Sequence, residues 1–123
     1  MATYLITGAT GGIGEAICAR LARDHRLILT ARDKSRLEAL ALTLKGPHLV
    51  LPADMASDES VASLGQRMQD ERLVLDGLVL MPPQPHADGE PMPEPHVWRE
   101  LFQKSFIGPL SLLKAGIARM RPD

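Results

Sequence analysis

The chain of 123 residues is long enough for one compact domain and too short for two. Hydrophobic residues make up 45% of it and charged residues 24%, which excludes a wholly disordered chain. Lysine and arginine number 14 against 15 aspartates and glutamates, so the net charge of -1 leaves no basic excess for nucleic-acid binding through bulk electrostatics.

The first part of the chain alternates short apolar runs with helical patterns. Residues 3–7 form a β-prone run that ends at a cluster of glycines, as a buried strand would. Apolar residues then recur at every fourth position and predict a helix over about 13–23. A second short strand is expected at 27–30.

The next two helices carry start signals. Asp33 is a good N-cap for a helix that Gly46 and Pro47 end, and a third strand is expected at 49–51. Ser57 is a second N-cap, and the acidic residues that follow it suit the positive end of a helix dipole. The fourth strand is expected at 77–80.

The last third of the chain combines a proline-rich stretch with a long helix. Residues 82–95 hold six of the ten prolines, so this loop can form neither a helix nor a central strand. A last helix is expected over 96–120, with an apolar stripe that we expect to pack on the sheet. The stripe consists of Phe102, Phe106, Leu110, Leu113, Ile117 and Met120.

Strands and helices alternate along the whole chain, which is typical of an α/β fold with a parallel sheet between helices. Right-handed crossovers predict the strand order 3-2-1-4. We therefore expect residues 1–123 to form a single, partial domain of this kind. Its architecture would be a Rossmann-like, doubly wound parallel sheet of about four strands with helices on both faces.

A glycine-rich loop, TGATGGIG at 7–14, joins the first strand to the first helix. Glycines let the backbone turn sharply and approach a pyrophosphate, and the helix N-terminus offers amide donors. The alternative is a turn that only packs strand against helix. The spacing Gly8-x-x-x-Gly12-x-Gly14 resembles the T-G-x-x-x-G-x-G signature of the short-chain dehydrogenase/reductase family, which binds NAD(H) or NADP(H). The resemblance implies cofactor binding by Gly8, Thr10, Gly11, Gly12, Ile13 and Gly14.

Arg32 stands near the end of the second strand, where dinucleotide-binding folds distinguish the two cofactors. A guanidinium there favours the 2′-phosphate of NADP(H) and can stack on adenine, the alternative being a solvated surface arginine. Many NADP-preferring relatives also carry a basic residue where this chain has Gly11, and the acidic Asp33 is assigned to helix capping. We therefore favour NADP(H) over NAD(H).

The resemblance extends further along the chain. Asp54 matches the family's aspartate that hydrogen-bonds the adenine amino group, with a loop cap as the alternative, and Met55 is a further expected cofactor-binding residue. Trp98 and Gly108 match the family pattern W-x6-N-x-x-G in register. Ser105 falls at the position of the family's active-site asparagine in that pattern, and a serine hydroxyl is a shorter substitute.

Other departures from the family pattern bear on catalysis. Residues 80–83 read Leu-Met-Pro-Pro where the family reads Asn-Asn-Ala-Gly, so this wall of the cofactor pocket should be shaped differently. The family's catalytic serine and Tyr-x-x-x-Lys have no match up to residue 123, and Tyr4 cannot substitute because it lies in the first strand. Hydride transfer to a carbonyl needs a positioned proton donor, so we expect no catalysis by this chain alone.

Two functions remain open. The first is the NAD(P)(H)-binding part of a short-chain dehydrogenase/reductase-type oxidoreductase, which transfers hydride between an alcohol and a carbonyl. The second is a non-catalytic nucleotide-sensing or protein-association module with the same fold. An uncovered fourth strand and the apolar last helix predict a homodimer or a complementing chain.

The remaining residues suggest no further chemistry. Cys18 is the only cysteine, so no internal disulfide can form, and we interpret it as a buried apolar residue rather than a reactive thiol. His86 and His96 flank acidic residues without a metal-ligand spacing, so no metal site is expected. No apolar run reaches about 18 residues, and we expect no membrane contact and a cytoplasmic location.

Overall fold

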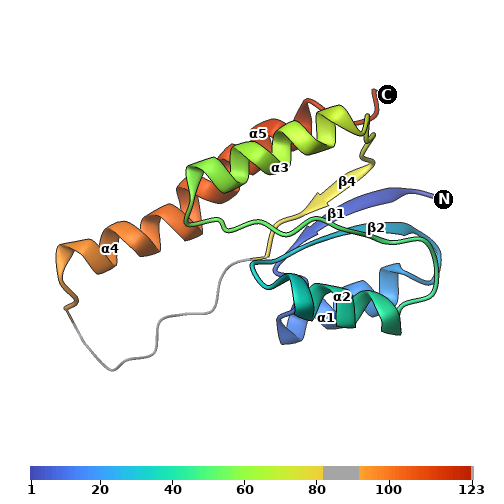
Figure 1. The fold of residues 1–123 in the computed structure, drawn as a ribbon, viewed down its shortest axis with the longest axis horizontal. Coiled ribbons are helices and arrows are strands. Elements are labelled where there is room, and N and C mark those ends of the chain that lie inside the picture. Colours follow the sequence, from blue (N-terminus) through green and yellow to red (C-terminus); the bar gives the residue numbers. More distant parts are fainter. Residues whose placement is uncertain (82–91, 123) are drawn as a thin grey trace.

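Four parallel strands form one sheet in the computed structural model, which describes residues 1–81 and 92–122 (Figure 1). They are β1 (Thr3–Thr7), β2 (Arg26–Thr30), β3 (Leu49–Val50) and β4 (Gly77–Val79). Their order, β3-β2-β1-β4, confirms the predicted order. The third and fourth strands each end one residue earlier than expected.

The central strand β1 pairs with β2 over its whole length, from Thr3 opposite Arg26 to Thr7 opposite Thr30. On its other side β1 pairs with β4, with Tyr4 opposite Gly77. Both central strands are nearly continuous runs of buried apolar residues, because helices cover both faces of a parallel sheet.

Two helices cover each face of the sheet (Figure 1). The helices α1 (Gly12–Leu21) and α2 (Lys34–Thr43) lie on one face, and α3 (Asp58–Asp70) and α5 (Gly108–Ile117) lie on the other. Successive side chains of a strand point to opposite faces, so two cores form. The first core includes Ile6, Cys18, Leu29 and Leu37, and the second includes Leu5, Ile28, Leu64 and Leu112.

Both predicted N-caps are confirmed. A carboxylate oxygen of Asp33 accepts a hydrogen bond from the backbone N–H of Arg36 at 3.2 Å. The hydroxyl oxygen of Ser57 accepts one from the backbone N–H of Ser60, also at 3.2 Å. Each cap satisfies one of the amide donors that the first turn of a helix leaves free.

The helix expected over 96–120 consists of three consecutive segments. The first is α4 (Pro95–Phe102), the second is a π-helical turn, η1 (Gln103–Ile107), and the third is α5. The helix ends at Ile117, three residues before the predicted end, because Met120 forms an isolated parallel β-bridge with Leu75. The predicted helix is therefore confirmed over most of its length, with a π-helical turn inside it that the sequence pattern did not predict.

The prediction that the apolar stripe of this helix packs on the sheet is also wrong. Four of its six side chains, Phe102, Phe106, Leu110 and Ile117, are exposed, whereas Leu113 and Met120 are half-buried. The buried positions of α5 are Gly108, Leu112 and Gly116. A Cβ atom at Gly116 would lie 2.8 Å from the side chain of Leu78, so the helix approaches the sheet closely through small residues. A search for large apolar side chains does not detect such a contact.

Several smaller expectations concern single residues. Cys18 is fully buried, and this burial, together with the nearby charge of Glu15, raises the pKa of its thiol to about 11, as suits a structural cysteine.

Within the described residues no group of ligands suits a metal ion, and no helix is long and apolar enough to cross a bilayer. His86 and most of the proline-rich loop over 82–95 lie outside the described residues.

Candidate functional site

A cavity of about 490 Å³ lies at the carboxyl ends of the strands, where parallel α/β sheets bind their ligands. Its volume falls in the range of small-molecule sites, about 300–1,000 Å³. The glycine-rich loop, the end of β2, the segment after β3 and the start of α5 contribute to its wall. Seven of the expected cofactor-binding residues line it: Gly8, Thr10, Gly11, Gly12, Arg32, Asp54 and Met55.

The glycine-rich loop has a geometry that depends on two of its glycines. Gly8 has a φ of +62°, a backbone conformation that residues other than glycine rarely adopt. A Cβ atom at Gly14 would overlap the carbonyl oxygen of Gly8, so this glycine lets helix α1 pack against the loop. At Gly12, by contrast, a Cβ atom would meet nothing within 4 Å, because this residue borders the open cavity.

Helix α1 begins at the cavity without a capping side chain. Its N-cap is Gly11, which offers no side-chain acceptor, whereas α2 and α3 are capped by Asp33 and Ser57. The first amide groups of a helix carry partial positive charge and favour an anion. The start of α1 can therefore bind a phosphate group.

Two threonines lie at the wall of the cavity and differ in their hydrogen bonds. The hydroxyl of Thr7 accepts a hydrogen bond from the backbone N–H of Met81 at 2.9 Å, which holds the end of β4 beside the glycine loop. The hydroxyl of Thr30 is buried and has no hydrogen-bond partner among the described residues. Buried polar atoms rarely stay unpaired, so a bound ligand is a natural partner for it.

Three cations and one carboxylate line the cavity. Arg32 and the carboxylate of Asp54 were expected there, and Arg36 and Lys104 were not. Asp54 also accepts a hydrogen bond from the backbone N–H of Ala56 at 2.9 Å, so the loop-cap alternative is realised as well. Arg36 comes four residues after Arg32, and this spacing could have indicated that both line the cavity. No local pattern marks Lys104.

The segment carrying Asp54 and Met55 is held in place by the last helix. The side-chain amide of Gln103 donates to the carboxylate of Asp58 at 2.8 Å and contacts the carbonyl oxygen of Met55 at 3.5 Å. A Cβ atom at Gly108 would overlap that same carbonyl oxygen. The glycine of the W-x6-N-x-x-G pattern thus allows the helix to contact the cavity wall.

Other residues named from the sequence lie away from the cavity. Ile13 is 68% exposed, and Gly14 is buried behind the loop. Ser105 is exposed and borders a shallow groove with Trp98 and Phe102. Tyr4 packs edge-to-face on His25, with their rings 5.2 Å apart, and lies within β1 as expected.

Comparison with known proteins covers almost the whole chain. Residues 2–123 match the family model for short chain dehydrogenases. Over 80 residues the chain is 38% identical to an NADPH-dependent pterin aldehyde reductase of Arabidopsis thaliana, covering 63% of this chain and 33% of that protein.

Two solved structures illustrate the likeness in fold. A bulky-bulky ketone specific alcohol dehydrogenase from Comamonas testosteroni matches with a TM-score of 0.81 and 27% identity, over 97% of this chain and 51% of that one. A short-chain dehydrogenase from Sphingobium yanoikuyae in complex with NADPH matches with a TM-score of 0.77 and 28% identity, over 97% and 48%. The chain therefore spans a third to a half of the length of these proteins.

Proposed function

The chain belongs to the short-chain dehydrogenase family, and from this membership we propose that its cavity binds NADP(H) in preference to NAD(H). One observation carries the proposal: an uncapped helix N-terminus and Arg32 line the same cavity. The first suits a pyrophosphate, and the second suits the phosphate that distinguishes NADP(H) from NAD(H). An NADPH-dependent relative and a structural neighbour in complex with NADPH support this preference.

The residues of the cavity fit such a cofactor. Gly12 leaves open space beside the start of α1, where the pyrophosphate would bind. The unpaired hydroxyl of Thr30 offers a polar partner at the buried wall. Asp54 would bind the adenine amino group, and Arg32 the phosphate on the adenosine ribose.

We further propose that the reaction served is hydride transfer between an alcohol and a carbonyl, with the hydride supplied or accepted by the nicotinamide when the cofactor is bound. This chain contributes cofactor binding to that reaction. The developing alkoxide also needs a proton donor. Tyr4, the only tyrosine of the sequence, packs on His25, and Ser105 is exposed outside the cavity. Purified alone, the chain should bind cofactor without turnover.

A thermal-shift titration with NADPH and, separately, NADH tests the preference. A ligand at about 100 times its dissociation constant stabilises a protein by roughly 2.7 kcal/mol. For a domain of this size the melting temperature should then rise by about ten degrees or more. We expect this rise with NADPH and a smaller one with NADH, and Arg32→Gln should reduce the difference. A folded protein whose melting temperature responds to neither nucleotide would refute the proposal.

The second candidate function is protein association, and the exposed apolar side chains of α4, η1 and α5 favour it. We call these side chains the exposed apolar patch: Trp98, Phe102, Phe106, Leu110 and Ile117, each more than half exposed. The rings of Phe102 and Phe106 stack with their centroids 5.1 Å apart. No residue of α4 is buried, and the helix extends away from the sheet (Figure 1). Large exposed apolar surfaces are typical of protein contacts.

We propose that the exposed apolar patch and the outer edge of β4 pair with a second copy or with a complementing chain. Among the described residues β4 is hydrogen-bonded to a strand on one side only. Sedimentation at micromolar concentration should show a dimer, and Phe106→Ser combined with Leu110→Ser should shift it toward the monomer. A wild-type monomer that binds no apolar dye would contradict this proposal. A monomeric variant that still binds NADPH would separate the two functions.

A further inference from the structure

Two arginines of the cavity wall lie four residues apart in the sequence. Arg32 follows β2, and Arg36 belongs to the first turn of α2. The guanidinium of Arg36 donates a hydrogen bond to the carbonyl oxygen of Thr10 at 3.3 Å, so it reaches from α2 to the glycine-rich loop. A guanidinium has five N–H donors, and this contact uses one of its terminal nitrogens. Most of its hydrogen-bonding capacity is therefore free for a ligand.

The charge of these two arginines is not neutralised by the fold. Neither forms an ion pair with a carboxylate in the described part of the chain, where the ion pairs involve Lys34, Arg67 and Arg121. The nearby carboxylate of Asp33 caps α2 and does not line the cavity. A carbonyl oxygen orients a guanidinium but carries no full negative charge.

The position of Arg36 is also unfavourable for the helix that carries it. A positive charge in the first turn of a helix is repelled by the helix dipole. Helix α3 follows the usual rule, with acidic residues in its first turn, whereas α2 has none there. A cation that does not suit its helix and faces a cavity indicates a role in binding an anion.

We propose that Arg36 is a second binding residue for the 2′-phosphate of NADP(H), acting beside Arg32. The inference rests on the proposed function and assigns a further residue to the same site. The two guanidinium groups would share one dianionic phosphate, each through charge-assisted hydrogen bonds. The contact with Thr10 places the Arg36 guanidinium at the glycine-rich loop, where the sequence itself offers Gly11 and no cation.

Calorimetric titration of the purified chain with NADP⁺, NAD⁺, 2′,5′-ADP and 5′-AMP tests this assignment. A lost hydrogen bond between charged groups corresponds to a weakening of about ten- to a hundredfold. Arg36→Gln should weaken the binding of NADP⁺ and 2′,5′-ADP by about this factor. The affinities for NAD⁺ and 5′-AMP should stay within about twofold of the wild type. Arg36→Lys, which keeps the charge and loses the planar fork, should give an intermediate affinity. Lys34→Gln is the matched control, since Lys34 is in the same turn and does not line the cavity.

The outcomes separate the inference from the proposed function. If the wild type binds NADP⁺ more tightly than NAD⁺ and only Arg32→Gln removes the difference, Arg36 has no part in phosphate binding. If Arg36→Gln weakens all four ligands equally, the residue only supports the glycine-rich loop, and the inference is also overturned. A wild type without preference for 2′-phosphorylated ligands would overturn the proposed function and the inference together.

Discussion

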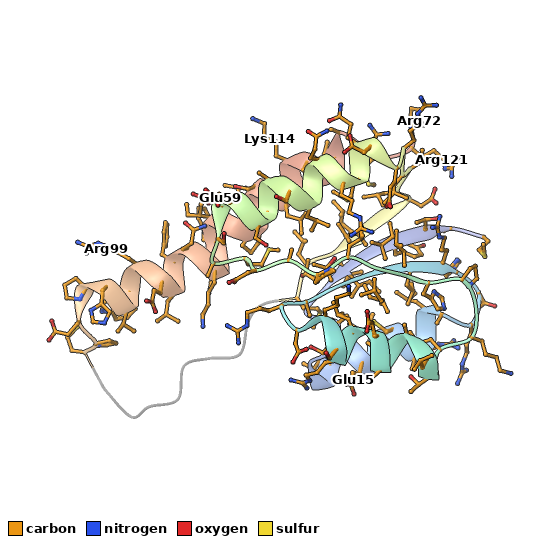
Figure 2. The ribbon with its side chains drawn as sticks, viewed as in Figure 1. Glu15, Glu59, Arg72, Arg99, Lys114 and Arg121 are labelled. Atoms are coloured by element: carbon orange, nitrogen blue, oxygen red, sulfur yellow. The ribbon has the colours of Figure 1, made fainter. Side chains whose placement is uncertain are left out.

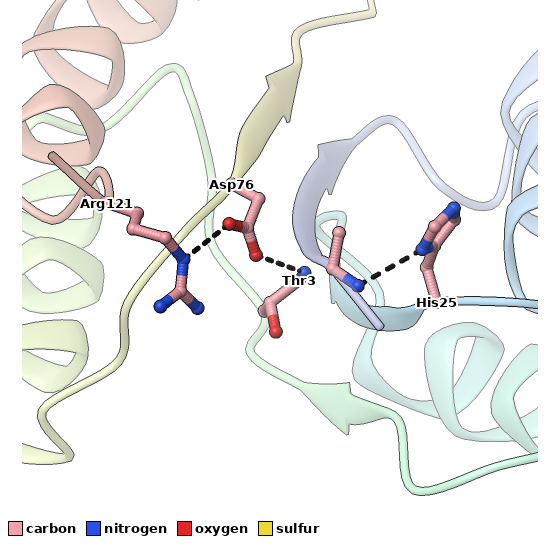
Figure 3. A network of polar contacts seen from close by, with 5 residues as sticks. Thr3, His25, Asp76 and Arg121 are labelled. Atoms are coloured by element: carbon pink, nitrogen blue, oxygen red, sulfur yellow. Dashed lines mark hydrogen bonds and ion pairs between the residues drawn. The ribbon is translucent and has the colours of Figure 1, made fainter. Parts of the chain in front are cut away.

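At the amino ends of the strands, both carboxylate oxygens of Asp76 are bonded, whereas the cations at the carboxyl ends face an open cavity. One oxygen of Asp76 accepts a hydrogen bond from the guanidinium of Arg121 at 2.7 Å, and the other accepts one from the backbone N–H of Thr3 at 2.8 Å (Figure 3). Beside them the backbone N–H of Ala2 donates to the ring of His25 at 3.2 Å (Figure 3).

The carboxyl ends show the opposite pattern. Arg32 and Arg36 have no carboxylate partner among the described residues, and the hydroxyl of Thr30 is buried without a hydrogen bond. Arg121 lies close to Arg72 (Figure 2), beside Thr3 and Arg26 at the starts of β1 and β2. The comparison teaches that polar groups paired with each other stabilise the fold, and that the groups without partners lie at the candidate binding site.

The largest expected effect comes from Gly14, which separates the loop's structural role from its binding role. Gly14→Ala forces a Cβ atom onto the backbone of Gly8 and should lower the free energy of unfolding by about 3 kcal/mol, the upper end of overpacking costs. Gly12→Ala has room and should change it by less than about 0.5 kcal/mol while weakening NADPH binding. Urea unfolding measures the free energies of unfolding, and titration with NADPH measures the affinities. Equal losses of stability would contradict the structure of the loop.

A glycine near the amino ends of the strands, Gly77, provides the test that corresponds to Gly14 at the carboxyl ends. A Cβ atom at Gly77 would lie 2.6 Å from ring carbons of Tyr4, a side chain that can shift more easily than backbone. Gly77→Ala should therefore cost about 1 kcal/mol and leave NADPH affinity unchanged. Tyr4→Leu in the same chain should recover part of the loss, which a double-mutant cycle measures. A change in cofactor affinity would show that the two ends are not independent.

Removing charge should affect the two ends differently. Without ligand, Arg32→Gln and Arg36→Gln should each change the free energy of unfolding by less than about 0.5 kcal/mol, because neither side chain is paired with a carboxylate of residues 1–81 or 92–122. Arg121→Gln should destabilise the chain, since it leaves Asp76 without its ion-pair partner. Thermal unfolding of the three variants checks this. A larger loss for Arg32→Gln than for Arg121→Gln would reverse the interpretation of the two ends.

The smallest effect is a pH dependence at Asp76. The hydrogen bond from Arg121, followed by that from the backbone of Thr3, holds the pKa of this carboxyl below its ordinary value of 3.8. The ionised form is therefore favoured by folding: its contribution is fully present above the ordinary pKa and is lost as the pH falls through the lower value in the folded state. The pair is exposed, so the effect is small.

Asp76→Asn isolates this contribution. The variant should be less stable than the wild type near neutral pH, and the difference should shrink as the pH falls below the ordinary pKa and vanish below the lower pKa of the folded state. Urea unfolding at a series of pH values measures the difference. A difference that stays constant with pH would show that the charge of Asp76 is not what stabilises the amino ends.

Much of the fold could be predicted because its signals are local. The four strands, the caps at Asp33 and Ser57, and the strand order follow from hydrogen-bonding preferences and from the handedness of crossovers. The glycine-rich loop was also recognisable, because its conformation is encoded in consecutive residues such as Gly8 and Gly14. Seven of the expected cofactor-binding residues line one cavity for the same reason: each lies within a few residues of the end of a predicted strand.

The last helix shows where local signals are not enough. Its sequence has one face of large apolar residues and another of glycines with Leu112, and only the close approach to Leu78 and Met55 decides which face is buried. Likewise, Lys104 and Arg36 line the cavity through the way their helices pack, although the spacing of Arg36 from Arg32 was visible. The sequence by itself determined the elements, the loop and the family resemblance. Only the tertiary structure decided the buried helix face and the full set of cations at the cavity, because both depend on contacts between residues far apart in the chain.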